Sequence, residues 1–235
     1  MSKGKLYLIP SPLGDNEPSE VIPAPVLEQA CRLRCYVVEE LRTARRFLSK
    51  YGLKGHIDEI EFHELNEHTA QAEVEEMASL FDRCDVGLIT EAGLPAVADP
   101  GATLVALCHR KGIDVVPFTG PSSLMLALMA SGLNGQSFAF RGYLPAKTDE
   151  RRQALKNIEK LSAQLGQSQI FIETPYRNDS LLADMLNILS AETRICIAAD
   201  ITLESQFIKT KKVREWKKEQ GLCIGKRPCV FIVLA

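Results

Sequence analysis

Short apolar runs alternate with helix-length segments along the first half of the chain. Runs rich in β-branched and other apolar residues predict strands at 6–9, 36–39, 60–63, 85–90 and 113–117. Segments between them carry apolar residues at helical spacing, with charged residues at the other positions, at 42–51, 69–81 and 102–111. Because the strands are almost continuously apolar, this alternation predicts a mostly parallel sheet with helices on both faces.

The pattern changes after Pro117. Helices are predicted at 121–131, 149–165 and 179–189. Strands are predicted at 138–143, 169–173, 195–199, 206–211 and 229–234. The last three strands are close together in the sequence, which favours antiparallel pairing and a mixed sheet. We therefore expect an α/β protein of two lobes with mixed, largely parallel sheets, residues 1–117 and residues 118–235.

Composition narrows the classes of protein that fit. The chain has 235 residues, 46% of them hydrophobic, and a net charge of −2. The length allows a full hydrophobic core. The near-neutral charge excludes a protein that covers nucleic acid with its whole surface, so a basic site must be a local patch. No apolar run reaches the ~18–20 residues of a membrane span, and Pro10 interrupts the first apolar stretch too early for a signal peptide.

Cysteine and histidine usage gives no metal-binding spacing. Seven cysteines are scattered along the chain without a Cys-x-x-Cys pair. Reduced thiols in a cytoplasmic protein explain them best. Structural or solvated roles are expected for the four histidines, and no metal is predicted.

Three loops that follow predicted strands carry candidate binding chemistry. Loop 10–14 holds two prolines and Gly14, which allow a rigid turn and a close backbone approach. Loop 90–101 has small side chains, two Gly/Pro turns and Asp99, which is placed to cap the next helix. Loop 118–123 offers hydroxyls and helix N–H groups that either bind a ligand or cap the helix. Since none of these loops has the glycine and lysine pattern of a phosphate loop, a nucleoside-like ligand without a phosphate chain is favoured.

Charged residues add further candidates. Glu39, Glu40 and Arg42 follow the second strand, where they form either a base with its partner or a surface ion pair. Polar residues at 63–67 either line the same site or form a solvated loop. Basic residues gather in two places, at Arg141, Lys147, Arg151 and Arg152, and at 209–218 around Trp216. Each group either binds phosphates, with Trp216 stacking on a base, or forms a solvated loop.

Taken in order, these loops resemble a known family. The string Pro-Ser-Pro-Leu-Gly-Asp at 10–15 is similar to the family's Pro-Thr-Pro-Ile-Gly-Asn, and Thr-Glu-Ala-Gly-Leu-Pro at 90–95 is similar to its Ser-Asp-Ala-Gly-Thr-Pro. Further similar strings lie at 38–42, 63–67, 99–101, 116–121, 142–147 and 171–177. The chain resembles the tetrapyrrole methylase family of S-adenosylmethionine-dependent methyltransferases from about residue 5 to residue 204. Within this family, the chain most resembles the branch of small-subunit ribosomal RNA 2′-O-ribose methyltransferases. The string Gly-Tyr-Leu-Pro-Ala-Lys at 142–147 is the most specific to that branch.

The resemblance implies a site and a reaction. It implies two lobes with S-adenosylmethionine in the cleft between them, usually in a homodimer. The residues implied to hold the cofactor are Pro10, Leu13, Gly14, Gly93, Leu94, Val97, Ser122, Ser123, Leu124, Ile172, Ala199, Pro228 and Cys229. We expect Glu40 or Glu67 to take a proton from the ribose hydroxyl, and Arg42 and Lys147 to hold phosphates. Ribosomal RNA or the small ribosomal subunit is the implied partner, and a membrane is not.

Departures from the family's strings leave alternatives open. Leu41 stands where the family has threonine, Leu65 where it has histidine, and Ala199 where it has arginine. The sequence also ends at Ala235, where that branch continues into a helical extension. A tetrapyrrole or other small-molecule methyltransferase, and a cofactor-binding protein without transfer activity, are therefore kept as alternatives.

Overall fold

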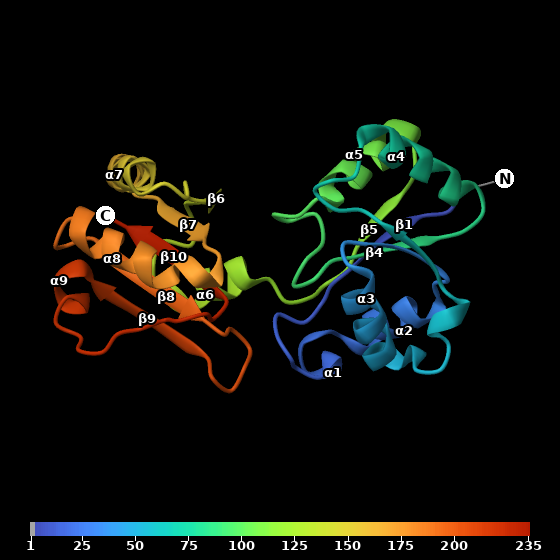
Figure 1. Cartoon of the computed structure of the whole chain (residues 1–235), viewed down its shortest axis with the longest axis horizontal. Helices are drawn as coiled ribbons and strands as arrows, with labels where there is room; N and C mark the ends of the chain where they lie inside the picture. The colour runs from blue at the N-terminus through green and yellow to red at the C-terminus, as the bar shows by residue number, and fades with distance from the viewer. Residues whose placement is uncertain (1–2) are drawn as a thin grey trace. The chain divides into compact units, whose positions relative to one another are not determined.

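The computed structural model describes residues 3–235, which form two compact α/β units (Figure 1). The units are Met1–Ser122 and Ser123–Ala235, so the division falls after residue 122, where the sequence predicts it after residue 117. No helix in the described part of the chain is long and apolar enough to cross a membrane.

A parallel sheet forms the centre of the first unit. Its strands are β1 (Leu6–Ile9), β2 (Cys35–Val38), β3 (Glu61–Glu64), β4 (Val86–Ile89) and β5 (Val115–Pro117). They lie in the order β3-β2-β4-β1-β5, and every neighbouring pair is parallel. The five predicted strands are confirmed. Because all five run the same way, the loops that follow them meet at one edge of the sheet.

Helices cover both faces of this sheet (Figure 1). One face packs against α4 (Gln71–Glu76), η3 (Met77–Asp82) and α5 (Gly101–Lys111). The other packs against α1 (Pro18–Val21), α2 (Ala24–Arg32), α3 (Leu41–Leu48), η1 (Ser49–Leu53) and η2 (Ile57–Glu59). The sequence analysis predicts no element at α1 and α2. In the structure each helix has proline in its first turn, where a missing N–H costs nothing.

The second unit has a mixed sheet, as the sequence predicts. Its strands are β6 (Phe138–Tyr143), β7 (Ser168–Ile172), β8 (Arg194–Ala199), β9 (Phe207–Lys212) and β10 (Cys229–Leu234). They lie in the order β6-β7-β10-β8-β9, with β6 and β7 parallel and the other pairs antiparallel. The helices are α6 (Ser123–Ser131), α7 (Thr148–Leu165), η4 (Pro175–Arg177), α8 (Asn178–Ile188) and α9 (Val213–Trp216).

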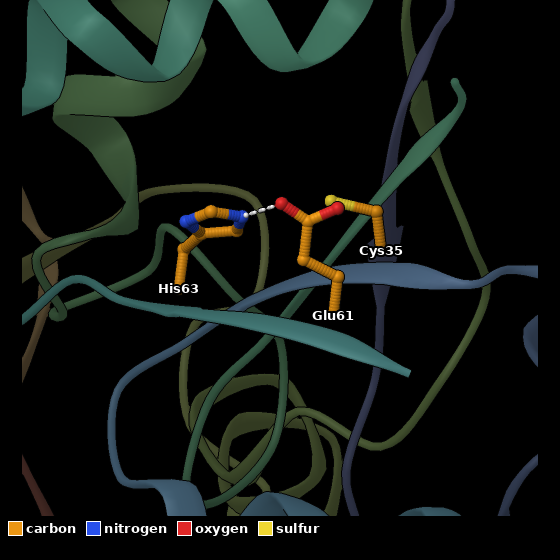
Figure 2. A group of neighbouring side chains, drawn as sticks. All are labelled: Cys35, Glu61 and His63. Atoms are coloured by element: carbon orange, nitrogen blue, oxygen red, sulfur yellow. Dashed lines mark hydrogen bonds and ion pairs between the residues drawn. The ribbon is translucent and has the colours of Figure 1, made fainter. Parts of the chain in front are cut away.

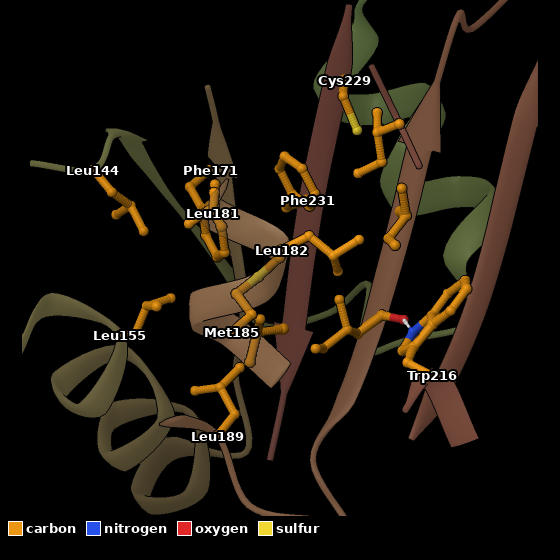
Figure 3. Packing of buried hydrophobic residues seen from close by; sticks show 14 of the residues in the cluster. Leu144, Leu155, Phe171, Leu181, Leu182, Met185, Leu189, Trp216, Cys229 and Phe231 are labelled. Atoms are coloured by element: carbon orange, nitrogen blue, oxygen red, sulfur yellow. Dashed lines mark hydrogen bonds between the residues drawn. The ribbon is translucent and has the colours of Figure 1, made fainter. Parts of the chain in front are cut away.

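The core of the second unit includes Trp216 (Figure 3). Apolar side chains of α7 and α8 pack on β7, β8 and β10, where the rings of Phe171 and Phe231 stack with centroids 5.9 Å apart. The Trp216 side chain is 1% exposed, and its indole N–H donates to the carbonyl oxygen of Ile195 at 3.0 Å. Neither alternative considered for Trp216, stacking on a nucleic-acid base or a solvated loop, describes this buried side chain. Its bulk is used to fill the core, while the lysines around it reach solvent.

Arg151 also lies inside the second unit. It donates from Nε to the Asp184 carboxylate at 2.8 Å, and the Arg152 Nε donates to the other oxygen at 2.8 Å. The Arg151 and Asp184 side chains are 5% and 6% exposed. Burial raises the pKa of Asp184, but the hydrogen bonds from Arg152 and Arg151 outweigh it and lower the pKa overall. Arg151 is therefore a structural cation that joins α7 to α8, which excludes the phosphate-binding alternative for this residue.

Replacing Asp184 with asparagine should lower the free energy of unfolding by about 3–5 kcal/mol, because the buried Arg151 charge loses its partner. Urea unfolding measures this. The matched control is Glu150→Gln, whose ion pair with Lys147 is exposed and contributes about 0–1 kcal/mol. Since folding lowers the pKa of Asp184, the pair stabilises the fold above the ordinary carboxyl pKa of 3.8 and the contribution is lost as the pH falls further. Equal losses in the two variants would contradict this assignment.

Candidate functional site

The loops after β1 and β4 are joined by backbone hydrogen bonds. The Ser11 N–H donates to the Gly93 carbonyl at 2.8 Å, and the Gly93 N–H donates to the Ser11 carbonyl at 3.1 Å. The buried Ser11 hydroxyl donates to the carbonyl of Thr90 at 2.8 Å. These bonds bring the predicted cofactor residues of the first loop beside those of the second, namely Pro10, Leu13 and Gly14 beside Gly93 and Leu94.

Two glycines let the backbone segments approach closely. A Cβ on Gly120 would lie 2.1 Å from the Cβ of Pro10, so the loop after β5 touches the loop after β1 only because residue 120 is glycine. Gly93 has φ +77°, a conformation that favours glycine. The result is a surface made of backbone from three loops. Such a surface offers N–H and carbonyl groups to a flat ligand with little side-chain bulk in the way.

The loop between β4 and α5 holds strained residues around Asp99. Ala96 and Ala98 have φ values of +65° and +63°, which cost free energy in a residue with a Cβ. The Asp99 carboxylate accepts hydrogen bonds from the N–H groups of Ala96 at 2.9 Å and Gly101 at 2.8 Å. Asp99 thus binds the first turn of α5, as the sequence predicts, and it also fixes the loop. The predicted residue Val97 lies between the two alanines and is 46% exposed.

Acidic side chains gather at the same edge of the sheet. The N–H of Glu91 donates to the Glu39 carboxylate at 3.5 Å. Burial raises the pKa of Glu39, and the nearby charges of Asp99, Glu91 and Glu67 add to this, against the hydrogen bond from Glu91. Glu39 is among the candidates that follow the second predicted strand, whereas Glu91 has no role of its own in the sequence analysis. The two meet because they follow β2 and β4, which are neighbouring strands.

Of the catalytic residues expected in this unit, Glu40 has a clear local role. Its carboxylate accepts hydrogen bonds from the N–H groups of Arg42 at 2.9 Å and Thr43 at 2.6 Å, which caps α3. These bonds lower the pKa of Glu40, so it is a weaker base than an ordinary glutamate. The Arg42 side chain is exposed. Glu67 is exposed as well, and its carboxylate lies 3.6 Å from the His68 ring.

In the second unit, four predicted cofactor residues lie at the same end of three neighbouring strands, β7, β10 and β8. Cys229 pairs with Ala199 across β10 and β8, and Val230 pairs with Ile172 across β10 and β7. The N–H of Asp200 donates to the carbonyl of Pro228 at 3.0 Å. Ile172, Ala199, Pro228 and Cys229 therefore lie close together, as the family resemblance implies for residues that bind one ligand.

Asp200 stabilises the turn that follows β8. It has φ +50°, and its carboxylate accepts hydrogen bonds from the Arg227 Nε at 2.7 Å and the Ser205 hydroxyl at 2.9 Å. Thr202 in the same turn has φ +76°. The pairing of Asp200 with Arg227 is absent from the sequence-based predictions, since 26 residues separate the two along the chain. The left-handed backbone of a non-glycine residue has no sequence signal here.

The remaining predicted residues lie near helix starts. Ser122, Ser123 and Leu124 stand at the start of α6 and are half-buried. Lys147 precedes α7, and its side chain is 81% exposed and pairs with Glu150 at 3.1 Å. Two other basic side chains that are phosphate-binding candidates also have protein partners. Arg141 donates to Gln169 at 2.7 Å, while Lys212 pairs with Glu192 at 2.7 Å.

Comparison with known proteins identifies the family. Residues 5–217 match the family model described as Tetrapyrrole (Corrin/Porphyrin) Methylases. A relative from Haemophilus influenzae, named ribosomal RNA small subunit methyltransferase I, is 33% identical over 220 residues, which cover 92% of this chain and 74% of the relative.

Solved structures show the same fold. A diphthine synthase superposes with a TM-score of 0.66 at 18% identity, covering 99% of this chain and 90% of that one. A uroporphyrin-III C-methyltransferase from Thermus thermophilus, solved with S-adenosylhomocysteine, has a TM-score of 0.55 at 16% identity and covers 98% of this chain and 97% of that one. The chain belongs to the tetrapyrrole methylase family and is an S-adenosylmethionine-dependent methyltransferase.

Proposed function

We propose that the chain methylates a ribose 2′-hydroxyl of small-subunit ribosomal RNA, in the cytoplasm and as a homodimer. The observation that carries the RNA target is the similarity to relatives named ribosomal RNA small subunit methyltransferase I along most of the chain. The string Gly-Tyr-Leu-Pro-Ala-Lys at 142–147 supports the same branch. A tetrapyrrole substrate and a binding-only role are not favoured. All seven cysteines are free thiols, which suits the reducing cytoplasm.

The residues of each unit fit the proposed cofactor. In the first unit, the backbone around Pro10, Gly93 and Gly120 offers hydrogen-bonding groups without a phosphate-binding lysine. In the second unit, Glu173 follows Ile172, and its buried Oε2 accepts no hydrogen bond within the described residues. A buried carboxylate oxygen that accepts no hydrogen bond from the protein can accept one from a ligand, such as a nucleoside. We propose that these groups, with Ser122–Leu124, Ala199, Pro228 and Cys229, hold the cofactor.

The protein must orient the acceptor and remove its proton. Bound S-adenosylmethionine supplies a methyl group that its sulfonium already makes electrophilic. Positioning of the acceptor in line with that methyl can then contribute about 7–11 kcal/mol. We assign proton acceptance to Glu67, whose exposed carboxylate is not engaged by a helix N-terminus. We assign Glu40 a positioning role, because its carboxylate caps the N-terminus of α3, the helix that carries Arg42.

Phosphate binding is proposed for Arg42 and Lys147. The ion pair between Lys147 and Glu150 is exposed. Because an exposed ion pair contributes little free energy, an RNA phosphate can replace the carboxylate. Because the chain has a net charge of −2, few phosphates are contacted, and the salt dependence of RNA binding should be shallow.

Replacing Gly120 with alanine should weaken cofactor binding, because the new methyl group cannot fit beside Pro10 and must push two loops of the binding surface apart. We expect the dissociation constant for S-adenosylhomocysteine, measured by calorimetry, to rise at least about tenfold, or ~1.4 kcal/mol. Gly135→Ala is the matched control, since a Cβ there has nothing within 4 Å. Unchanged affinity in a folded Gly120→Ala protein would refute the proposed binding surface.

The RNA target is tested by mapping 2′-O-methylation of ribosomal RNA in cells with and without the gene. We expect one small-subunit methylation to disappear and to return with the wild-type protein or with Glu28→Gln, an exposed control on α2. Glu67→Gln should fail to restore it, since loss of a general base costs about 10²–10⁴-fold in rate. An unchanged methylation map would disprove the RNA target without affecting the cofactor assignment. Full restoration by Glu67→Gln would disprove the role of Glu67 alone.

A further inference from the structure

A group of unlike side chains lies on one face of the first sheet, outside the proposed methyl-transfer site. The Cys35 Sγ, a Glu61 carboxylate oxygen and a His63 ring nitrogen all lie within 4.8 Å of one another. Figure 2 shows the three side chains pointing toward one another from neighbouring strands, with His63 Nε2 and Glu61 Oε1 2.9 Å apart. Neither the proposed reaction nor the proposed cofactor site uses them.

Sheet register explains why these residues meet. Cys35 pairs with Glu61 and Val37 pairs with His63 across β2 and β3, and alternate residues of a strand share a face. Cys35, Glu61 and His63 therefore project from the same face of β2 and β3.

The donor set points to one class of metal ion. Thiolate, imidazole and carboxylate ligands together are typical of zinc and similar ions, whereas magnesium and calcium prefer oxygen ligands alone. We propose that Cys35, Glu61 and His63 form a three-ligand binding site for Zn²⁺ or another thiophilic divalent ion, with water completing the coordination. Binding releases the Cys35 thiol proton to solvent, and neutral imidazole and ionised carboxylate bind without further change.

Burial and charge around the group suit such an ion. Cys35 is 1% exposed, while the side chains of His63 and Glu61 are 30% and 44% exposed, so the group is anchored in the core and open to solvent. One thiolate and one carboxylate balance the charge of a divalent ion. The Glu61 carboxylate is shared with Arg83, whose guanidinium lies 3.0 Å away.

The position of the group indicates a structural role. Cys35 and Glu61 begin β2 and β3, so the group lies toward the amino ends of the strands, whereas the proposed cofactor surface follows their carboxyl ends. β3 is an edge strand that has only β2 as a neighbour. An ion bound here would join β3 to β2, and would stabilise the folded state by an amount that grows with the logarithm of the ion concentration above its dissociation constant.

Titration of the reduced, metal-free protein with Co²⁺ tests the proposal, because cobalt reports thiolate ligands by a charge-transfer band and tetrahedral geometry by its visible bands. We expect one Co²⁺ per chain, displaced by Zn²⁺, and a higher melting temperature with Zn²⁺. Cys35→Ser should remove the charge-transfer band. His63→Ala, which removes a half-buried side chain outside the core clusters, should weaken Co²⁺ binding at least tenfold.

Two controls separate this site from chance metal binding. His56→Ala removes a surface histidine that also pairs with a glutamate at 2.9 Å but has no cysteine beside it. Cys223→Ser removes an exposed thiol of the other unit. Both should bind Co²⁺ as the wild type does. Absence of a thiolate band in the wild type, or its persistence in folded Cys35→Ser together with unchanged affinity in His63→Ala, would overturn the proposal.

Discussion

The mutual backbone hydrogen bonds between Ser11 and Gly93 are the constraint on which the proposed cofactor surface depends. They join the loops after β1 and β4, two neighbouring strands at the centre of a parallel sheet. Gly120 then allows the loop after β5 to close on Pro10. Three loops from distant parts of the chain thereby become one surface, and its rigidity comes from the sheet beneath it.

Electrostatics divides the charged residues into those that hold the fold and those free to meet a substrate. Arg151 is committed to Asp184, Arg227 to Asp200, and Glu40 to the first turn of α3. Exposed charges such as Lys147 and Glu67 have weak surface partners. Because the chain has a net charge of −2, the proposed contacts between its basic side chains and RNA phosphates must be few and local.

Sequence patterns predict the strands of both sheets and the longer helices, but not the short helices α1 and α2 or many side-chain roles. The strands of both sheets follow from apolar runs, and the loops after β1 and β4 follow from their glycines and prolines. Trp216 and Arg151, in contrast, lie in basic stretches that look exposed, yet both are buried because partners far along the chain, the Ile195 carbonyl and Asp184, satisfy their polar groups. The Cys35, Glu61 and His63 group has no motif spacing, since strand register alone brings it together.

We propose that the backbone of the first unit's loops binds the cofactor, and that Ala199 and Cys229 of the second unit contribute to its binding. Amide hydrogen exchange with and without S-adenosylhomocysteine tests it most directly, because backbone groups that bind a ligand exchange more slowly. We predict protection in segments 10–14, 93–99, 118–124, 199–202 and 227–229, and none in α7. Saturating ligand that leaves segments 10–14 and 93–99 unprotected would contradict the account.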